Sequence, residues 1–102
     1  METFSAPRNK TIVELAEDQI WLYENWEKLC KAHPKQVVGV EAKTVVAVAQ
    51  SYGHLYITLR AGGLRPADVA KAYMDTDPDR TELFLKQREG KIKAIREGDI
   101  LP

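Results

Sequence analysis

The chain has 102 residues, enough for one hydrophobic core but not for two, so a single domain is expected. Its formal net charge is zero, which argues against broad electrostatic attraction to nucleic acid or to an anionic membrane. No apolar run approaches the roughly 20 residues needed to span a bilayer, and no secretory signal is evident. The single cysteine, Cys30, is typical of a reducing compartment. Together these features predict a cytoplasmic protein without membrane association.

The first predicted element is a long helix. Thr11 and Glu14 have capping-box spacing, so Thr11 is the expected N-cap. The helix should end near residue 32, because His33 precedes a proline and is pushed out of the α region. Asp18 is a second candidate N-cap, at which the helix could be interrupted or begin. At 100° per residue, one broad apolar stripe contains Ile12, Leu15, Ala16, Leu22, Tyr23, Trp26, Leu29 and Cys30.

Residues 36–49 contain two short runs that are rich in valine and separated by a polar break. β-Branched residues suit a pleated sheet, and both runs are apolar at consecutive positions. This pattern predicts a β-hairpin that is covered on both faces and forms the centre of a sheet. The side chains expected to be largely buried there, or in the helices that cover the sheet, are Val38, Val40, Val46, Val48, Leu55, Leu59 and Trp26.

A second helix is predicted after the hairpin. Ser51 is a good N-cap, residues 52, 55, 56 and 59 have helical apolar spacing, and Gly62 and Gly63 provide the stop. Residues 69–74 fit either a third helix that starts near Pro66 or a short strand. Residues 81–85 fit a further strand, and the segment after them is charged.

The fold class predicted from these elements is α/β, with a small mixed sheet built on the central hairpin. The expected order is helix, strand, strand, helix and strand, and a further strand is added if residues 69–74 and 81–85 both form strands. The expected organisation is a flexible arm over residues 1–10, a single domain over residues 11–85 and a charged tail over residues 86–102.

Several of these features resemble a family of short prokaryotic proteins of unknown function. The residues that carry the resemblance are the segment around Trp26, the His33-Pro34 step, the two valine runs, Gly63, Asp68-Val69 and Tyr73. In that family a helix is followed by a Tyr-Pro or His-Pro step, a valine-rich hairpin, a helix that ends in glycine and a further strand. The resemblance covers roughly residues 25–85. It favours a strand at residues 69–74 and implies no activity.

The densest set of hard oxygen ligands is formed by Asp75, Asp77 and Asp79. Their spacing is that of the start of a calcium loop, but Arg80 stands where glycine is needed and Lys86 where a bidentate glutamate belongs. Aspartate is also a common turn residue for local reasons. A solvated turn without metal or cofactor is therefore favoured. A small metal-dependent or hydrolytic enzyme that uses these three carboxylates is the alternative.

The C-terminal segment contains five cations that could touch nucleic acid: Lys86, Arg88, Lys91, Lys93 and Arg96. Acidic residues dilute this charge, and Phe84 is the only nearby side chain that could stack on a base. We therefore favour a solvated segment over a nucleic-acid site.

The remaining hypothesis is a protein interface on the first helix. If that helix runs unbroken, Trp21 and Trp26 differ by about 140°, so Trp21 lies almost opposite the apolar stripe and needs another surface to cover it. The helix is acidic and the C-terminal segment is basic, which favours contact between them within one chain or between chains. We expect a non-enzymatic module that self-associates as a two-fold dimer or docks on a protein partner. Its predicted interface residues are Trp21, Val13, Ile20, Glu17 and Lys28.

Overall fold

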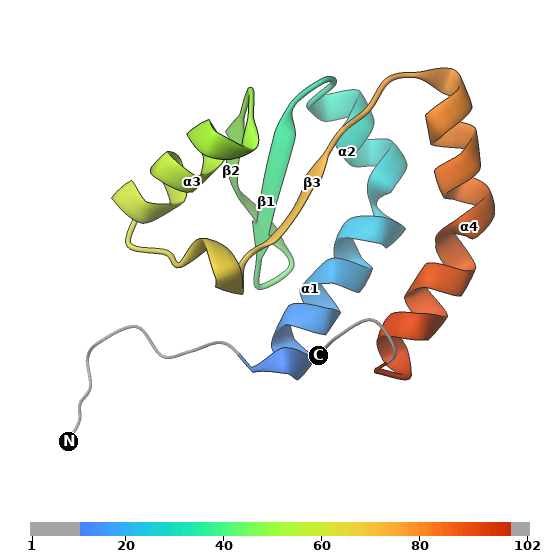
Figure 1. The fold of residues 1–102 in the computed structure, drawn as a ribbon, viewed down its shortest axis with the longest axis horizontal. Coiled ribbons are helices and arrows are strands. Elements are labelled where there is room, and N and C mark those ends of the chain that lie inside the picture. The colour runs from blue at the N-terminus through green and yellow to red at the C-terminus, as the bar shows by residue number, and fades with distance from the viewer. Residues whose placement is uncertain (1–10, 99–102) are drawn as a thin grey trace.

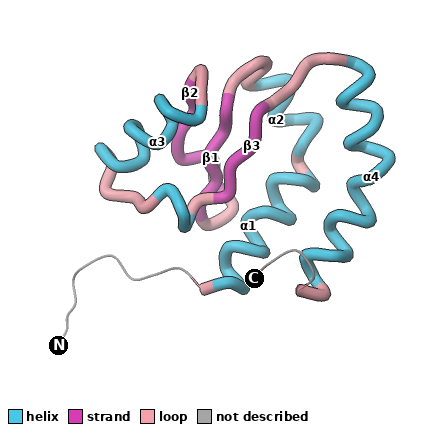
Figure 2. Tube along the Cα trace, viewed as in Figure 1, coloured by secondary structure: helices cyan, strands magenta, loops and turns pink. Residues whose placement is uncertain are grey.

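A computed structural model of the chain describes residues 11–98 and confirms an α/β fold. Figures 1 and 2 show a sheet with α3 on one side and α1 and α2 on the other, while α4 lies outside α1. The elements in chain order are α1 (Ile12–Glu24), α2 (Trp26–Ala32), β1 (Val37–Glu41), β2 (Thr44–Ala49), α3 (Tyr52–Ala61), a 3₁₀ turn (Pro66–Asp68), β3 (Ala70–Tyr73) and α4 (Pro78–Arg96). Among these elements, none of the helices is long and apolar enough to cross a membrane.

The central strand is β1, which pairs antiparallel with β2 on one side and with β3 on the other. The sheet is therefore antiparallel throughout rather than mixed. Val38 and Val40 face α1, whereas Val37 faces α3. Gly39 also lies on the α3 side, where an added Cβ would come within 3.2 Å of Cγ1 of Val69. Both faces of β1 are buried, as its continuous apolar run predicts.

The second strand of the hairpin lies at the edge of the sheet, so it is less buried than predicted. The register shifts between Gly39 and Val40, so that Ala47 pairs with Gly39 but Val45 pairs with Val40. Val46 is the extra residue of this β-bulge, and its side chain is 40% exposed. The prediction that Val46 is buried is wrong for this reason, and Val48 is only half-buried.

The first helix is interrupted, which changes how its faces are distributed. α1 begins after the Thr11 capping box as predicted, but it ends at Glu24, and α2 starts at Trp26. Asn25 has φ −103° and ψ 18°, and its side-chain amide donates a hydrogen bond to the carbonyl of Trp21 at 2.9 Å. A residue that bonds its own preceding turn competes with helix continuation. The assumption of one unbroken helix is therefore wrong.

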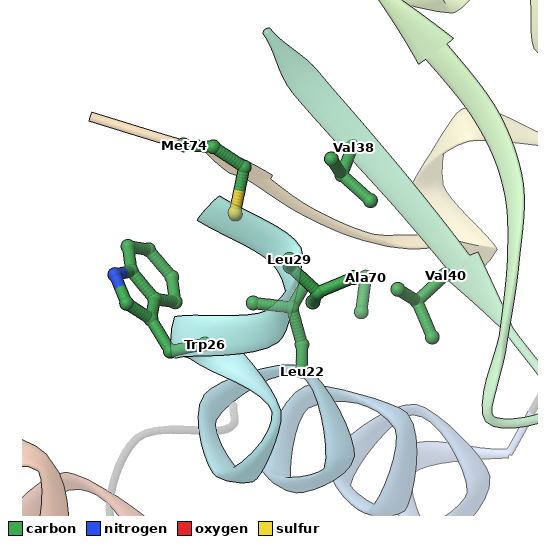
Figure 3. Packing of buried hydrophobic residues seen from close by; sticks show 7 residues of the cluster. All are labelled: Leu22, Trp26, Leu29, Val38, Val40, Ala70 and Met74. Carbon is green, nitrogen blue, oxygen red and sulfur yellow. The ribbon is translucent and has the colours of Figure 1, made fainter. Parts of the chain in front are cut away.

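The core on the α1 side of the sheet forms where three elements converge on β1. Figure 3 shows its buried side chains, which come from α1, α2, β1 and the β3 region and point toward one another: Leu22, Trp26, Leu29, Val38, Val40, Ala70 and Met74. A second buried cluster fills the space beneath α3 and contains Val37, Ala47, Leu55, Leu59 and Val69. The sheet thus separates two cores, and each buried strand position belongs to one of them.

Asp18 links the helical layer to the tip of the hairpin. The residue lies inside α1, so it is not an N-cap, and only 3% of it is exposed. Its carboxylate accepts the backbone N–H of Ala42 at 3.1 Å and that of Lys43 at 2.9 Å. Both turn residues have positive φ, 54° and 57°, as a type I′ hairpin turn requires. Since neither is Gly, Asn or Asp, the carboxylate stabilises a turn that its own residues disfavour.

The C-terminal half differs most from the sequence prediction. Within residues 69–74, Ala70–Tyr73 form strand β3, as the resemblance implies, after a short 3₁₀ turn that starts at Pro66. The predicted strand at residues 81–85 is wrong, because these residues belong to α4. Asp77 caps that helix and Pro78 occupies its first turn, a combination typical of a helix start. The predicted boundary at residue 85 falls inside α4, and residues 1–10 and 99–102 lie outside the described residues.

α4 packs against α1 and α2, and an aromatic contact lies near its start. The ring of Phe84 stacks on Trp26 with a centroid distance of 4.0 Å and meets Tyr23 edge-on at 5.3 Å. Such ring pairs contribute about 0.5–1.5 kcal/mol beyond the area that they bury. Ile92 and Ile95 are the buried residues further along the helix. The segment predicted to be a solvated tail therefore packs on the domain up to Arg96.

We expect Asp18→Ala to lower the free energy of unfolding by about 2–3 kcal/mol, because two hydrogen bonds to a charged acceptor are lost. Urea denaturation of the parent and the variant measures the difference. Glu17→Ala provides the control, because Glu17 is the exposed neighbour on the same helix. If the two variants lose the same stability, the carboxylate does not hold the turn.

The double variant Ala42→Asn/Lys43→Gly should gain about 1 kcal/mol of stability, because Asn-Gly is the preferred pair for a turn in which both residues have positive φ. Both N–H groups that Asp18 accepts are retained. Thermal unfolding should show a higher midpoint than that of the parent. A lower midpoint would mean that the native side chains of Ala42 and Lys43 outweigh the backbone strain.

Candidate functional site

Three of the predicted interface residues line one groove between α1 and the C-terminal end of α4. Val13, Glu17 and Ile20 come from α1, and Ile95 and Arg96 come from α4. Ile12, Ala16, Glu97 and Gly98 complete the lining of this hollow of about 420 Å³, which we call the α1–α4 groove. Val13 is 66% exposed and Ile12 54%, so the largest aliphatic groups of α1's first turn stand in solvent beside an apolar depression.

Trp21 does not have the position that an unbroken helix predicts. Its side chain is half-buried and packs against the same core cluster that contains Trp26. The helical pattern is broken at Asn25 between the two indoles, and both of them contact one core. Trp21 also lines a smaller hollow beside the groove, together with Glu24 and Lys43. Its placement opposite the core is thus wrong, and the argument that it needs a partner to cover it no longer holds.

Lys28 is exposed on α2 and does not line either of these hollows. The structure therefore gathers Val13, Glu17, Ile20 and Trp21 along one flank of α1 and leaves Lys28 outside that group. The sequence could not identify the second wall of the groove, because residues 86–96 carry no sustained apolar period and α4 is a mostly polar helix.

Two of the three carboxylates of the candidate metal turn are engaged by the protein itself, and the third, Asp79, is exposed in the first turn of α4. Asp75 accepts the N–H of Asp77 at 2.9 Å and pairs with Nε of Arg80 at 2.8 Å. Asp77 accepts the N–H of Asp79 at 2.9 Å and lies 3.4 Å from the Arg80 guanidinium. Within residues 11–98, no group of three or more His, Cys, Asp or Glu side chains is arranged to hold a metal ion. The geometry is that of a helix cap reinforced by an arginine.

The five cations that could touch nucleic acid are distributed along α4, and two of them contact the acidic helices. Arg88 donates to the Glu27 carboxylate at 2.7 Å and to the carbonyl of Tyr23 at 3.4 Å. Arg96 lies 3.6 Å from Glu24. These pairs confirm, within one chain, the predicted contact between the basic segment and the acidic helix. Of the other three, Lys86 pairs with Glu82 at 3.7 Å, Lys91 is half-buried and Lys93 is exposed.

Cys30 is poorly suited to nucleophilic chemistry. Its Sγ lies 3.9 Å from Sδ of Met74 and 3.9 Å from the carbonyl of Asp75. Burial raises the pKa of the thiol, and the carboxylates of Asp75 and Glu27 raise that pKa further. Since the thiolate is the reactive form, this environment keeps the sulfur in its inert, protonated state. Cys30 is a packing residue in this fold.

A second surface, which the sequence interpretation missed, lies on the opposite side of the sheet between α3 and β3. It surrounds a hollow of about 470 Å³ lined by Tyr56, Arg60, Arg65, Pro66, Ala67 and Lys71. Nζ of Lys71 lies 5.6 Å from the centre of the Tyr56 ring. The sequence signal was the spacing of Tyr52, Tyr56 and Arg60 at intervals of four residues, which places an aromatic and basic stripe on one side of α3.

Comparison of the chain with protein-family models, with curated proteins and with solved structures finds no match. The resemblance to short prokaryotic proteins therefore stays a prediction.

The Glu27–Arg88 pair should make stability depend on pH in acid. The hydrogen bond from Arg88 holds the pKa of Glu27 below its ordinary value of 4.5, so the pair contributes stability above that pH. The contribution is lost as pH falls through the lowered pKa of the folded state. Glu27→Gln should therefore be less stable than the parent at neutral pH by a small margin, because the carboxylate is exposed.

Urea midpoints of the two proteins, measured from neutral pH down through the pKa of Glu27, should converge as that carboxylate becomes protonated. Glu82→Gln is the matched control, because the Glu82–Lys86 pair lies on one exposed helix face. A difference between parent and Glu27→Gln that persists unchanged in acid would contradict the assignment.

Proposed function

We propose that the protein is a non-enzymatic interaction module of the cytoplasm that self-associates as a two-fold dimer through the α1–α4 groove. The observation that carries the proposal is the exposure of Ile12 and Val13 directly beside the groove. Aliphatic side chains that stand in solvent at the rim of an apolar depression favour burial against another surface. The second surface in this proposal is the same groove on another copy.

Self-complementarity supports a second copy as the occupant. A two-fold interface uses the same patch on both subunits, so one patch must offer both the projecting groups and the space that receives them. The α1–α4 groove has both, because Ile12 and Val13 project at one end of α1 while Ala16, Ile20 and Ile95 line the hollow. Fully burying an aliphatic side chain of this size contributes about 1.5–3 kcal/mol, and Ile12 and Val13 would gain roughly half of that, because they are 54% and 66% exposed. The gain occurs in each of the two protomers.

The charges around the groove also suit a second copy. Glu17 and Glu97 lie on its rim together with Arg96, whose side chain is 59% exposed. A two-fold arrangement brings the acidic rim of one protomer to the basic rim of the other. Rim charges of this kind steer association and fix the register more than they add affinity. The proposed assembly is accordingly weakened by salt.

The engagement of Asp75 and Asp77 by backbone N–H groups and Arg80 gives the enzyme hypothesis no comparable support. Docking on a different protein would use the same groove, and the experiment that follows separates that case from self-association.

We expect the parent protein to sediment as a dimer at micromolar concentration and Val13→Asp to sediment as a monomer. An aspartate in the first turn of a helix is favourable for the helix itself, so the loss of assembly would not arise from unfolding. Ile57→Asp is the matched control, because Ile57 is an aliphatic residue that is 67% exposed on α3, on the other side of the sheet. This control should dimerise like the parent.

Two results would overturn the proposal. A parent that stays monomeric in the micromolar range excludes self-association at that concentration, and docking of a different protein in the groove is then the remaining hypothesis. A Val13→Asp variant that assembles as well as the parent places the interface elsewhere on the molecule.

A further inference from the structure

The edge strand β3 is only partly covered on the side of the sheet where α3 lies. α3 packs against β2 and β1. The antiparallel register places Lys71 opposite Gly39 and Tyr73 opposite Val37, and both partners face α3. Lys71 and Tyr73 therefore point to the same side of the sheet from the edge strand β3. Lys71 is half-buried there, and Tyr73 is exposed.

One stripe of α3 borders this partly covered strand. Tyr52, Tyr56 and Arg60 follow one another at intervals of four residues, so they lie on one side of the helix. The contact between Lys71 and the Tyr56 ring shows that this side is turned toward β3. All three stripe residues are exposed. Tyr56 and Arg60 of the stripe and Lys71 of β3 line the hollow described above. Tyr52 and Tyr73 lie on the same two elements outside that lining, and we call the hollow together with these two flanking rings the α3–β3 groove.

The hollow in this groove is positively charged. Its lining contains Arg60, Arg65 and Lys71 and no carboxylate, although the chain as a whole has no net charge. The acidic neighbour of Arg65 is Asp68, at 3.8 Å. The Arg65 side chain is half exposed and the pair is long, so it contributes little and leaves guanidinium N–H groups able to bind another anion. The three cations therefore produce a local positive potential that composition conceals.

The ammonium group of Lys71 is fixed in place. It donates to the carbonyl of Pro66 at 2.7 Å and to that of Val69 at 3.0 Å. An ammonium has three N–H donors, so one remains beyond these two hydrogen bonds. Burial lowers the pKa of Lys71, since no full negative charge compensates for the lost water. An anion in the hollow would supply that compensation.

We infer that the α3–β3 groove binds single-stranded nucleic acid. Phosphates would contact Arg60, Arg65 and Lys71, and bases would stack on the exposed rings of Tyr52 and Tyr73. Cations along a groove with aromatic side chains beside them are the pattern by which proteins bind single strands. The bases of a duplex are not available to such rings, and an acidic peptide would use the cations but not the tyrosines.

The groove suits a short segment of a single strand. Tyr52 and Arg60 are separated by eight residues, which corresponds to about 12 Å along a helix. This length matches about three stacked bases at a rise of roughly 3.4 Å each. The site is on the opposite side of the sheet from the α1–α4 groove, so dimer formation leaves it open. It is also distinct from the α4 cations.

The test is fluorescence anisotropy of a labelled oligothymidine of about twelve nucleotides, titrated with the full chain. Three phosphate contacts predict that affinity falls roughly ten- to twentyfold as salt rises from about 50 to about 200 mM. Arg60→Glu should weaken binding at least about tenfold, because it replaces a contact with a repulsion. No binding by the parent at the lower salt concentration overturns the inference.

Lys93→Glu is the matched control, because Arg60 and Lys93 are both exposed cations in the last turn of their helices. This variant should retain the affinity of the parent. If Lys93→Glu loses as much affinity as Arg60→Glu, the inference is wrong. The strand would then be attracted by the protein's positive charge in general, or would bind along α4. Melting curves of both variants establish that they are folded.

A second set of measurements tests the aromatic part of the site. Tyr52→Ala and Tyr73→Ala should each weaken binding about tenfold, whereas Tyr52→Phe should retain it, because stacking needs the ring and not the hydroxyl. An abasic strand of the same length should compete at least about tenfold less well than oligothymidine. Equal competition by the abasic strand would indicate a site for phosphate alone. Equal competition by polyglutamate would indicate an acidic protein partner, and either result overturns the inference.

Discussion

The buried carboxylate of Asp18 fixes the geometry on which the other layers depend. It accepts two successive N–H groups at the tip of the β1–β2 hairpin, a concave arrangement that favours an anion. A carboxylate this deep in a protein is costly unless hydrogen bonds compensate for the lost water. The turn has the complementary requirement, because Ala42 and Lys43 are held in a left-handed conformation. Each group stabilises the other, and α1 is thereby positioned against the sheet at one defined point.

The hairpin turn that Asp18 holds sets the register of β1 against β2. This register determines which side chains of β1 face each of the two candidate surfaces. With the turn fixed, Val38 and Val40 face α1, and Val37 and Gly39 face α3. A one-residue slip would exchange these sets and expose both cores. β3 pairs with the other edge of β1, beyond the part of the sheet that α3 covers. Tyr73 is consequently exposed, and Lys71 is only half-buried.

The sequence predicted the elements whose signals are local, and it failed where tertiary contacts decide. Thr11, Ser51 and His33 mark helix ends by capping and proline chemistry, and the structure places the ends there. No comparable sequence signal marks the break at Asn25, because a helix usually continues through a single asparagine. That single residue determines whether Trp21 faces the core. The bulge at Val46 is similarly invisible, since every residue near it suits a strand.

α4 shows a different limit of sequence reasoning. Its N-terminal segment contains Leu83, Phe84 and Leu85, an apolar run that fits a strand as well as a helix. The choice is made by Asp77 and Pro78 at its start and by the stacking of Phe84 on Trp26. The cap can be read from the sequence, but the stacking cannot, because Trp26 lies more than fifty residues earlier in the chain. Once Phe84 is docked, Arg88 and Arg96 reach the acidic residues of the first two helices.

The pairing of α4 with those helices also explains why net charge is a poor guide to this molecule. Arg88, which looks free in the sequence, forms a close pair with Glu27, and Arg96 lies near Glu24 in a longer, exposed pair. The cations of the α3–β3 groove are less conspicuous in the sequence, because they come from a helix, a loop and an edge strand. A total charge of zero therefore combines a helical interface with paired charges and a hollow whose lining holds three cations and no carboxylate. Only the fold separates these two parts, because it determines which opposite charges come within a few ångströms of each other.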